Sequence, residues 1–248
     1  MKRISLFFLL AMLMSSMTVN AQNIQLHKDF GHALYDELSG RPSMTATLEM
    51  FKPDKLGSTF TFVDLDFQSD GMAGAYWEIF REFNLTKNRQ WAVHVEYNGG
   101  LSSDEELWTA NRFQHAILLG GAWNWASKDF SKTFSVQLMY KYYFKNRHYD
   151  AHAFSGFQLT EVWGLQFAKG ACTFSGFCDL WYDPNANGKL IFLSEPQFWY
   201  NFNTLKGWKG VNLSLGTEVE ISNNFVWNDF GQHNKFYVIP TIAAKWTF

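Results

Sequence analysis

The chain has 248 residues and a formal net charge of −2; charged residues make up 18% of it and aromatic residues 19%. The weakly negative charge argues against nucleic acid as a partner, because domains that bind nucleic acid carry a basic surface. The 25 Phe and 11 Trp residues are more rings than a soluble domain of this size would bury. We therefore expect part of the protein surface to face an apolar environment.

The N-terminal segment has the features of a secretory signal peptide. Lys2 and Arg3 precede an apolar run, residues 4–14, and the small residues of a cleavage site follow. The apolar run is shorter than the ~20 residues that a membrane-spanning helix needs. We expect residues 1–21 to be a signal peptide and residues 22–248 to be a single exported domain.

After the signal peptide, one pattern repeats without a linker or a change of composition. Phe134, Val136 and Leu138 alternate with Ser135 and Gln137, so one face of this segment is apolar and the other polar. Runs of this kind, separated by clusters of Gly, Asn, Asp and Lys, predict about twelve strands. The predicted strands are 23–30, 44–51, 58–68, 73–86, 91–99, 113–126, 131–145, 152–167, 171–182, 188–202, 208–221 and 236–248.

Strands with one apolar face fit either a soluble barrel with an apolar centre or a transmembrane barrel whose apolar faces meet lipid. The even number of strands, lengths near the ~10 residues needed to cross a bilayer, and rings near the strand ends favour the transmembrane barrel. Long connectors, 30–43 and 100–112, also alternate with compact ones such as TKNRQ and SKDF. We therefore predict an all-β fold, a closed transmembrane antiparallel β-barrel with outer-membrane lipid as its surroundings and both ends in the periplasm.

The chain ends on PTIAAKWTF, in which Ile242, Trp246 and Phe248 lie on one strand face. This ending resembles the assembly signal of outer-membrane β-barrels. The resemblance implies that Phe248 is read by the barrel-assembly machinery of a Gram-negative bacterium.

Two segments resemble the nucleoside-specific outer-membrane channel (Tsx-like) family. They are TLEMFKPDKLGSTFTFVDLDF, residues 47–67, and AYWEIFREFNL, residues 75–85. The resemblance implies a monomeric barrel of twelve strands with a narrow channel, and nucleosides as solutes. Other outer-membrane barrel families of the same general type share these features.

The phase of each strand identifies its lumen-facing residues once the apolar face is assigned to lipid. Carboxylates and aromatic rings dominate this set, so the lumen suits small neutral or cationic solutes and repels anions. The alternative is that the carboxylates only pair with basic groups across the lumen. The candidate lining residues are Glu49, Phe62, Asp64, Asp66, Glu78, Phe80, Glu82, His94, Glu96, Tyr143, Trp199 and Glu218.

Three places do not fit this pattern. Arg81 falls on the lipid face, which requires a position near the membrane interface or a change of register. Glu161 lies on an apolar face, and residues 116–125 are apolar on both faces. The sequence alone does not explain the last two.

The predicted function is passive uptake of small hydrophilic solutes, with nucleosides as the leading class. A plugged structural barrel that binds through loop 30–43, with His32 and Tyr35, is one alternative. A lipid-modifying enzyme embedded in the barrel is another, but its histidines have no spacing that would bring a catalytic pair together. No Cys/His pattern indicates a metal, and no cofactor is expected.

Overall fold

The structure is a computed structural model that describes residues 22–69, 71–104, 107–109, 114–147, 150–184, 189–226, 231 and 233–248. The expected signal peptide, residues 1–21, lies outside the described residues. Within these ranges no helix has the length and apolar character that a membrane span requires.

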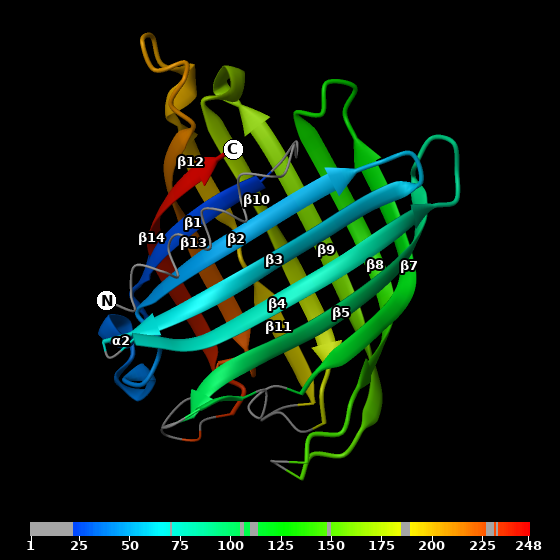
Figure 1. Ribbon diagram of the computed structural model, residues 1–248, viewed down its shortest axis with the longest axis vertical. Helices are drawn as coiled ribbons and strands as arrows, with labels where there is room; N and C mark the ends of the chain where they lie inside the picture. The colour runs from blue at the N-terminus through cyan, green and yellow to red at the C-terminus, as the bar shows by residue number, and fades with distance from the viewer. Residues whose placement is uncertain are drawn as a thin grey trace.

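The strands form one closed antiparallel barrel (Figure 1), because β14 pairs with β1 and completes the ring. Of fourteen strands, β6 only extends the pairing of β5, and β11 and β12 share one place in the ring, which leaves twelve wall positions. The expected closed barrel of about twelve strands is confirmed. The strands are β1 (Gln22–Asp29), β2 (Met44–Pro53), β3 (Gly57–Gln68), β4 (Gly71–Asn84), β5 (Trp91–Asp104), β6 (Leu107–Thr109), β7 (Ala116–Ala126), β8 (Lys132–Tyr143), β9 (Phe154–Phe167), β10 (Cys172–Tyr182), β11 (Leu190–Ser194), β12 (Gln197–Asn201), β13 (Leu213–Asn223) and β14 (Phe236–Thr247).

The wall position between β10 and β13 is interrupted at Glu195 and Pro196. Proline has no N–H group to donate to a neighbouring strand. On β10, Gly176 has a φ of 156°, and a Cβ atom there would lie 2.9 Å from the Cα atom of Pro196. The single strand expected over 188–202 is therefore two short strands.

The connectors differ between the two ends of the barrel. The turn end, marked by the label C in Figure 1, carries both ends of the barrel chain, and the Phe248 amide donates to the Gln22 carbonyl over 2.9 Å. The loop end, marked by α2, carries the connector 30–43. Two expectations are corrected: β5 continues to Asp104 into the expected loop 100–112, and the strand expected from residue 208 begins at Leu213. The turn-end connectors are 54–56, 85–90, 127–131, 168–171 and 202–212, and the loop-end connectors are 30–43, 69–70, 105–115, 144–153, 183–189 and 224–235.

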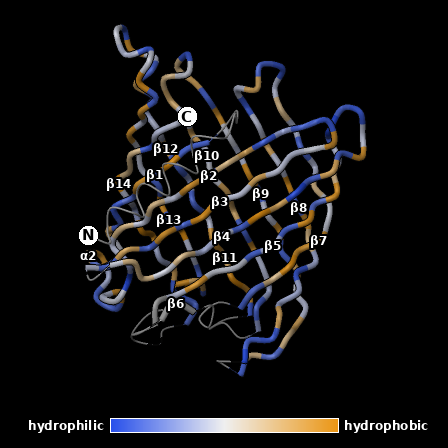
Figure 2. The backbone as a smooth tube through the Cα atoms, in the orientation of Figure 1, coloured by the Kyte–Doolittle hydropathy of each residue, from blue (hydrophilic) through white to orange (hydrophobic). Residues whose placement is uncertain are grey.

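Side chains alternate between the outside and the interior of the barrel. On β1, Leu26 is 47% exposed, whereas Gln25 and His27 are each 3% exposed. On β8, Leu138 is 63% exposed, whereas Gln137 is buried. Figure 2 shows the same alternation of apolar and polar residues along the strands. Apolar side chains thus point away from the barrel, as expected for a protein whose walls meet lipid.

Arg81 lies on the outer face at the turn end. Its Nη1 atom is 2.7 Å from Oδ2 of Asp54, and this hydrogen-bonded guanidinium holds the pKa of Asp54 well below its usual range. The ion pair places Arg81 at the edge of the barrel wall, where the membrane interface tolerates charge. Glu161 also faces outward, where it pairs across strands with Val136 and Cys178.

An apolar cluster lies inside the barrel at the loop end and explains why residues 116–125 are apolar on both faces. Ala116 and Leu118 point inward and are 1% exposed, whereas Ile117 and Leu119 point outward. The inner apolar cluster comprises Ala116, Leu118, Met139, Tyr143, Trp181, Ile191 and Leu193, with Phe154 and Phe177 packed against it. It fills one side of the interior.

The connector 30–43 packs inward at the opposite side of the loop end. It contains α2 (Gly31–Leu34) and a single helical turn, η1 (Asp36–Leu38). Leu38 is 2% exposed and packs with Tyr237 and Ile239, which lie on the inner face of β14. This connector therefore covers part of the barrel mouth.

A pH-sensitive contact holds connector 30–43 to connector 224–235. Lys235 donates a hydrogen bond to the Glu37 carboxylate, and this bond lowers the pKa of Glu37 below 4.5. A carboxyl group whose pKa is lowered by folding stabilises the folded state above its unfolded pKa and loses that contribution as pH falls through the folded value. We expect connector 30–43 to stay protected at pH 7 and to loosen below a pH of about 4.5.

The measurement is hydrogen exchange of residues 31–38 as a function of pH, corrected for the intrinsic exchange rate. In the Glu37→Gln variant the acid-dependent loss of protection should disappear. Equal pH profiles for the two proteins would contradict this assignment.

Candidate functional site: the barrel interior

Every candidate lining residue named from the sequence lies on an inward strand face. Most of them belong to two polar networks or to a line of rings, and Tyr143 belongs to the inner apolar cluster. On β2 and β3, Thr47 donates to Asp64 over 2.5 Å and Thr45 donates to Asp66 over 2.7 Å. Both acids therefore have hydroxyl donors on the adjacent strand.

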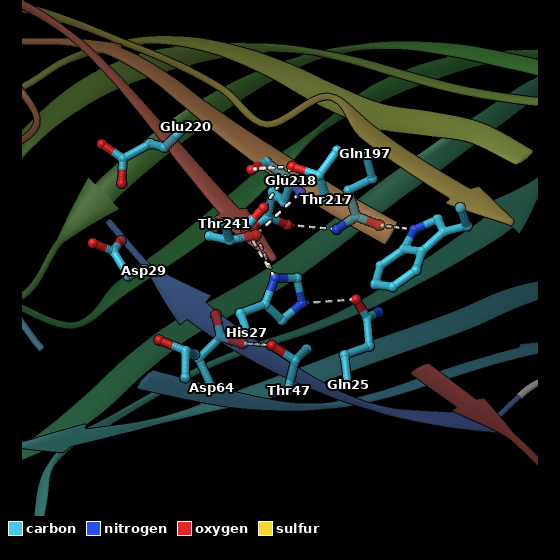
Figure 3. A network of polar contacts seen from close by, with 12 residues as sticks. Gln25, His27, Asp29, Thr47, Asp64, Gln197, Thr217, Glu218, Glu220 and Thr241 are labelled. Carbon is cyan, nitrogen blue, oxygen red and sulfur yellow. Dashed lines mark hydrogen bonds and ion pairs between the residues drawn. The ribbon is translucent and has the colours of Figure 1, made fainter. Parts of the chain in front are cut away.

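The first network is centred on His27 (Figure 3). Its Nε2 atom is 3.0 Å from the Gln25 Oε1 atom, and its Nδ1 atom is 3.2 Å from the Thr241 hydroxyl. This pattern suits a neutral imidazole that donates from Nε2 and accepts at Nδ1. We call this group the His27 network: Gln25, His27, Gln197, Glu218 and Thr241.

In this network, a hydrogen bond to Glu218 links β13 to the neighbouring wall position, which β11 and β12 share. Gln197 donates to Glu218 over 2.5 Å, and the Trp199 indole N–H donates to the Gln197 carbonyl oxygen over 2.9 Å. Trp199 is fully buried, and the ammonium of Lys245 lies 4.0 Å from its ring centroid. The ring of Trp199 is therefore covered by other side chains of the protein, although the sequence analysis predicted that it lines the open lumen.

Arg41 reaches into the barrel from connector 30–43. Its Nε atom is 3.0 Å from Asp29 and its Nη2 atom 2.7 Å from Glu220. Burial alone would lower the pKa of Arg41, but Glu220 and Asp29 raise it above its ordinary value. Sequence reasoning missed Arg41, because a loop residue has no strand phase to show where it points.

Carboxylates dominate the His27 side of the interior. Glu49 accepts hydrogen bonds from Asn23 over 2.8 Å and from Gln25 over 3.0 Å. Glu195, at the wall interruption, is close enough to Glu218 for their charges to interact. The inward acids on this side are Asp29, Glu49, Asp64, Asp66, Glu195, Glu218 and Glu220, and the inward basic groups described there are Arg41 and Lys245, with His27.

A line of partly exposed rings lies on the inner faces of β3 and β4. The ring centroids of Phe60 and Phe80 are 5.2 Å apart, and those of Phe62 and Tyr76 are 6.0 Å apart. Phe80 continues the line to His94, with the ring centroids 4.7 Å apart. These rings present an aromatic wall next to carboxylates.

The second network is centred on His94, which is fully buried. Its Nδ1 atom is 3.4 Å from Glu82 and its Nε2 atom 2.8 Å from Glu96. Two carboxylate partners suit an imidazolium that donates from both nitrogens. We call this group the His94 network: Glu78, Glu82, His94, Glu96 and Asn98.

Glu78 is tied to β5 by the Asn98 amide, which donates to it over 2.7 Å. Tyr143, by contrast, belongs to the inner apolar cluster, where it stacks on Phe154 with centroids 4.3 Å apart. It lies beside Lys141, whose ammonium is 5.1 Å from the Tyr143 ring. Lys145, which the strand phase would also have placed inside, is exposed beyond the end of β8.

The comparisons with known proteins concern the family and the fold. A family model described as "Domain of unknown function (DUF5020)" matches residues 21–248. No curated protein matches the sequence.

Three solved structures illustrate the similarity in fold. The NanC porin is 13% identical, with a TM-score of 0.58 and coverage of 92% of this chain and 100% of that chain. The KdgM porin is 10% identical, with a TM-score of 0.49 and coverage of 92% and 99%. LpxR from Salmonella typhimurium is 8% identical, with a TM-score of 0.43 and coverage of 92% and 100%. At 13% identity, the likeness to the NanC porin shows that the chain has a porin-like barrel fold.

Proposed function

The chain belongs to the DUF5020 family, and we propose that it is a monomeric channel of the Gram-negative outer membrane for passive uptake of small hydrophilic solutes. The observation that carries this proposal is the composition of the interior. Inward carboxylates outnumber inward Lys and Arg side chains among the described residues, so the lumen favours neutral and cationic solutes. The porin-like fold supports the same reading.

Nucleosides are the solute class that we propose first. The resemblance of residues 47–67 and 75–85 to Tsx-like channels supports this choice. The partly exposed rings of Phe60, Phe62 and Phe80 offer faces on which a planar base can stack, and nearby carboxylates can accept hydrogen bonds from sugar hydroxyls.

Ion selectivity tests the channel proposal. In planar bilayers with a KCl gradient, the purified protein should conduct and should prefer K⁺ over Cl⁻. The Glu49→Gln/Glu218→Gln double variant should lower this preference, because both side chains are partly exposed to the interior. The reversal potential is the measurement.

Glu161→Gln is the matched control, since it makes the same chemical change on the outer face of β9. Its reversal potential should equal that of the unchanged protein. A double variant with unaltered selectivity would remove Glu49 and Glu218 from the pathway, and a protein without conductance would refute the channel.

A plugged barrel is the second candidate, and the inward connector 30–43 together with the inner apolar cluster favours it. Liposome swelling distinguishes the channel from the plugged barrel. Solute flux supports the channel, no flux supports the plug, and released fatty acid would instead indicate the enzyme alternative.

We also propose that Phe248 serves assembly. Its side chain is 52% exposed at the turn end, where a partner could reach it.

A further inference from the structure

Among the described residues, five buried side-chain oxygens have no hydrogen-bond partner; two are the hydroxyls of Ser102 and Ser135, and the three carboxylate or amide oxygens are Glu96 Oε1, Asn98 Oδ1 and Asp179 Oδ1. Glu96 and Asn98 are each 5% exposed. Leaving a buried acceptor unpaired is unfavourable, so native proteins seldom leave several together. The three oxygens indicate a donor that comes from outside the chain.

These acceptors belong to one region of the interior. Glu96 and Asn98 share the inner face of β5, and Asn98 pairs across strands with Glu78. Asp179 lies on the inner face of β10 between Phe177 and Trp181, which pack in the inner apolar cluster with Leu118, the cross-strand neighbour of Glu96. Lys141 is the cross-strand neighbour of Leu118 on its other side, so it lies at the same level of the barrel wall as Glu96.

The basic and amide groups of this region already have hydrogen-bond partners. The other Glu96 oxygen contacts His94, and the Asn98 amide nitrogen donates to Glu78. Lys141 donates to Gln158 over 2.7 Å.

The ammonium of Lys141 also lies 5.1 Å from the ring centroids of both Tyr143 and Trp181. It is therefore directed toward the inner apolar cluster. Lys141 and the His94 imidazolium are two cations and cannot balance the four carboxylates of Glu78, Glu82, Glu96 and Asp179. The region therefore has unpaired hydrogen-bond acceptors and a net negative charge.

We propose that Glu96, Asn98 and Asp179 form a binding site for a solute that carries a primary ammonium group. Such a group has three N–H donors and a positive charge, which match three free acceptors in an acidic setting. Leu118, the cross-strand neighbour of Glu96, supplies an apolar wall for the hydrocarbon part of the solute. The inference rests on the proposed channel, because the solute reaches the site through the lumen.

Calorimetric titration of the purified chain in detergent micelles with butylammonium chloride tests this site. We expect saturable binding. Glu96→Gln and Asp179→Asn should each weaken it about tenfold, because each removes a charge-assisted hydrogen bond. Glu161→Gln, which makes the same chemical change on the outer face of β9, should bind as the unchanged protein does.

Tetramethylammonium, which has a charge but no N–H donor, and 1-butanol, which has no charge, should bind at least tenfold more weakly. The proposal is overturned if butylammonium does not bind, if tetramethylammonium binds equally well, if Glu161→Gln has the same effect as Glu96→Gln, or if only calcium ions bind. Conductance is measured on the same preparation. Conductance without butylammonium binding refutes this site alone, and binding without conductance refutes the channel alone.

Discussion

Replacement of Arg41 by alanine is expected to destabilise the barrel by about 3 kcal/mol and to raise its conductance. The guanidinium bridges Asp29 and Glu220, whose side chains are 9% and 8% exposed. Without it, two nearly buried carboxylates are left without their cation. Removing one partner of a buried ion pair typically costs about 3–5 kcal/mol, and the lower bound applies because the Arg41 side chain is 22% exposed. The loss also frees connector 30–43 from the interior.

The free energy of unfolding by urea in lipid vesicles and the single-channel conductance are the two measurements. Arg41→Ala/Glu220→Gln should recover part of the lost stability, because it removes one of the uncompensated charges. The stability of Arg41→Lys should lie between that of the unchanged protein and that of Arg41→Ala, since an ammonium lacks the two-pronged geometry of the guanidinium.

Arg81→Ala provides a matched control, because Arg81 also pairs with an aspartate, Asp54, at an exposed site. Exposed ion pairs contribute about 0–1 kcal/mol, so this variant should lose little stability. If Arg41→Ala were no more destabilised than Arg81→Ala, the bridge would have no structural role.

The period-two pattern predicted the barrel wall because lipid-facing side chains are mostly apolar. Leu138 and Gln137 could be assigned to opposite faces from their alternation alone, and the structure places them so. Where both faces are apolar, as in residues 116–125, the pattern does not indicate which face points into the barrel. Ala116 and Leu118 of this segment belong to the inner apolar cluster, which only the arrangement of five strands brings together.

The candidate site was predictable residue by residue but not as networks. Strand phase indicated that His94 and Glu96 point inward, yet no spacing shows that both nitrogens of His94 meet carboxylates. Arg41 could have been suspected only as a basic residue in a loop next to an acidic lumen. Pro196 did carry a usable signal, because a proline in the middle of an expected strand indicates an interruption.

Replacement of Leu138 by arginine should destabilise the folded barrel in bilayers by about 2–4 kcal/mol, the second large effect that we expect. Leu138 lies near the middle of β8 on the outer face and is 63% exposed, so lipid must cover it. An arginine there would have to leave the hydrocarbon region or draw water into it. Phe130→Arg is the matched control, because Phe130 is 74% exposed in the turn-end connector 127–131, where a charge costs about 0–1 kcal/mol. Urea unfolding in vesicles measures both variants, and equal stability of the two would mean that the outer face of β8 does not meet lipid.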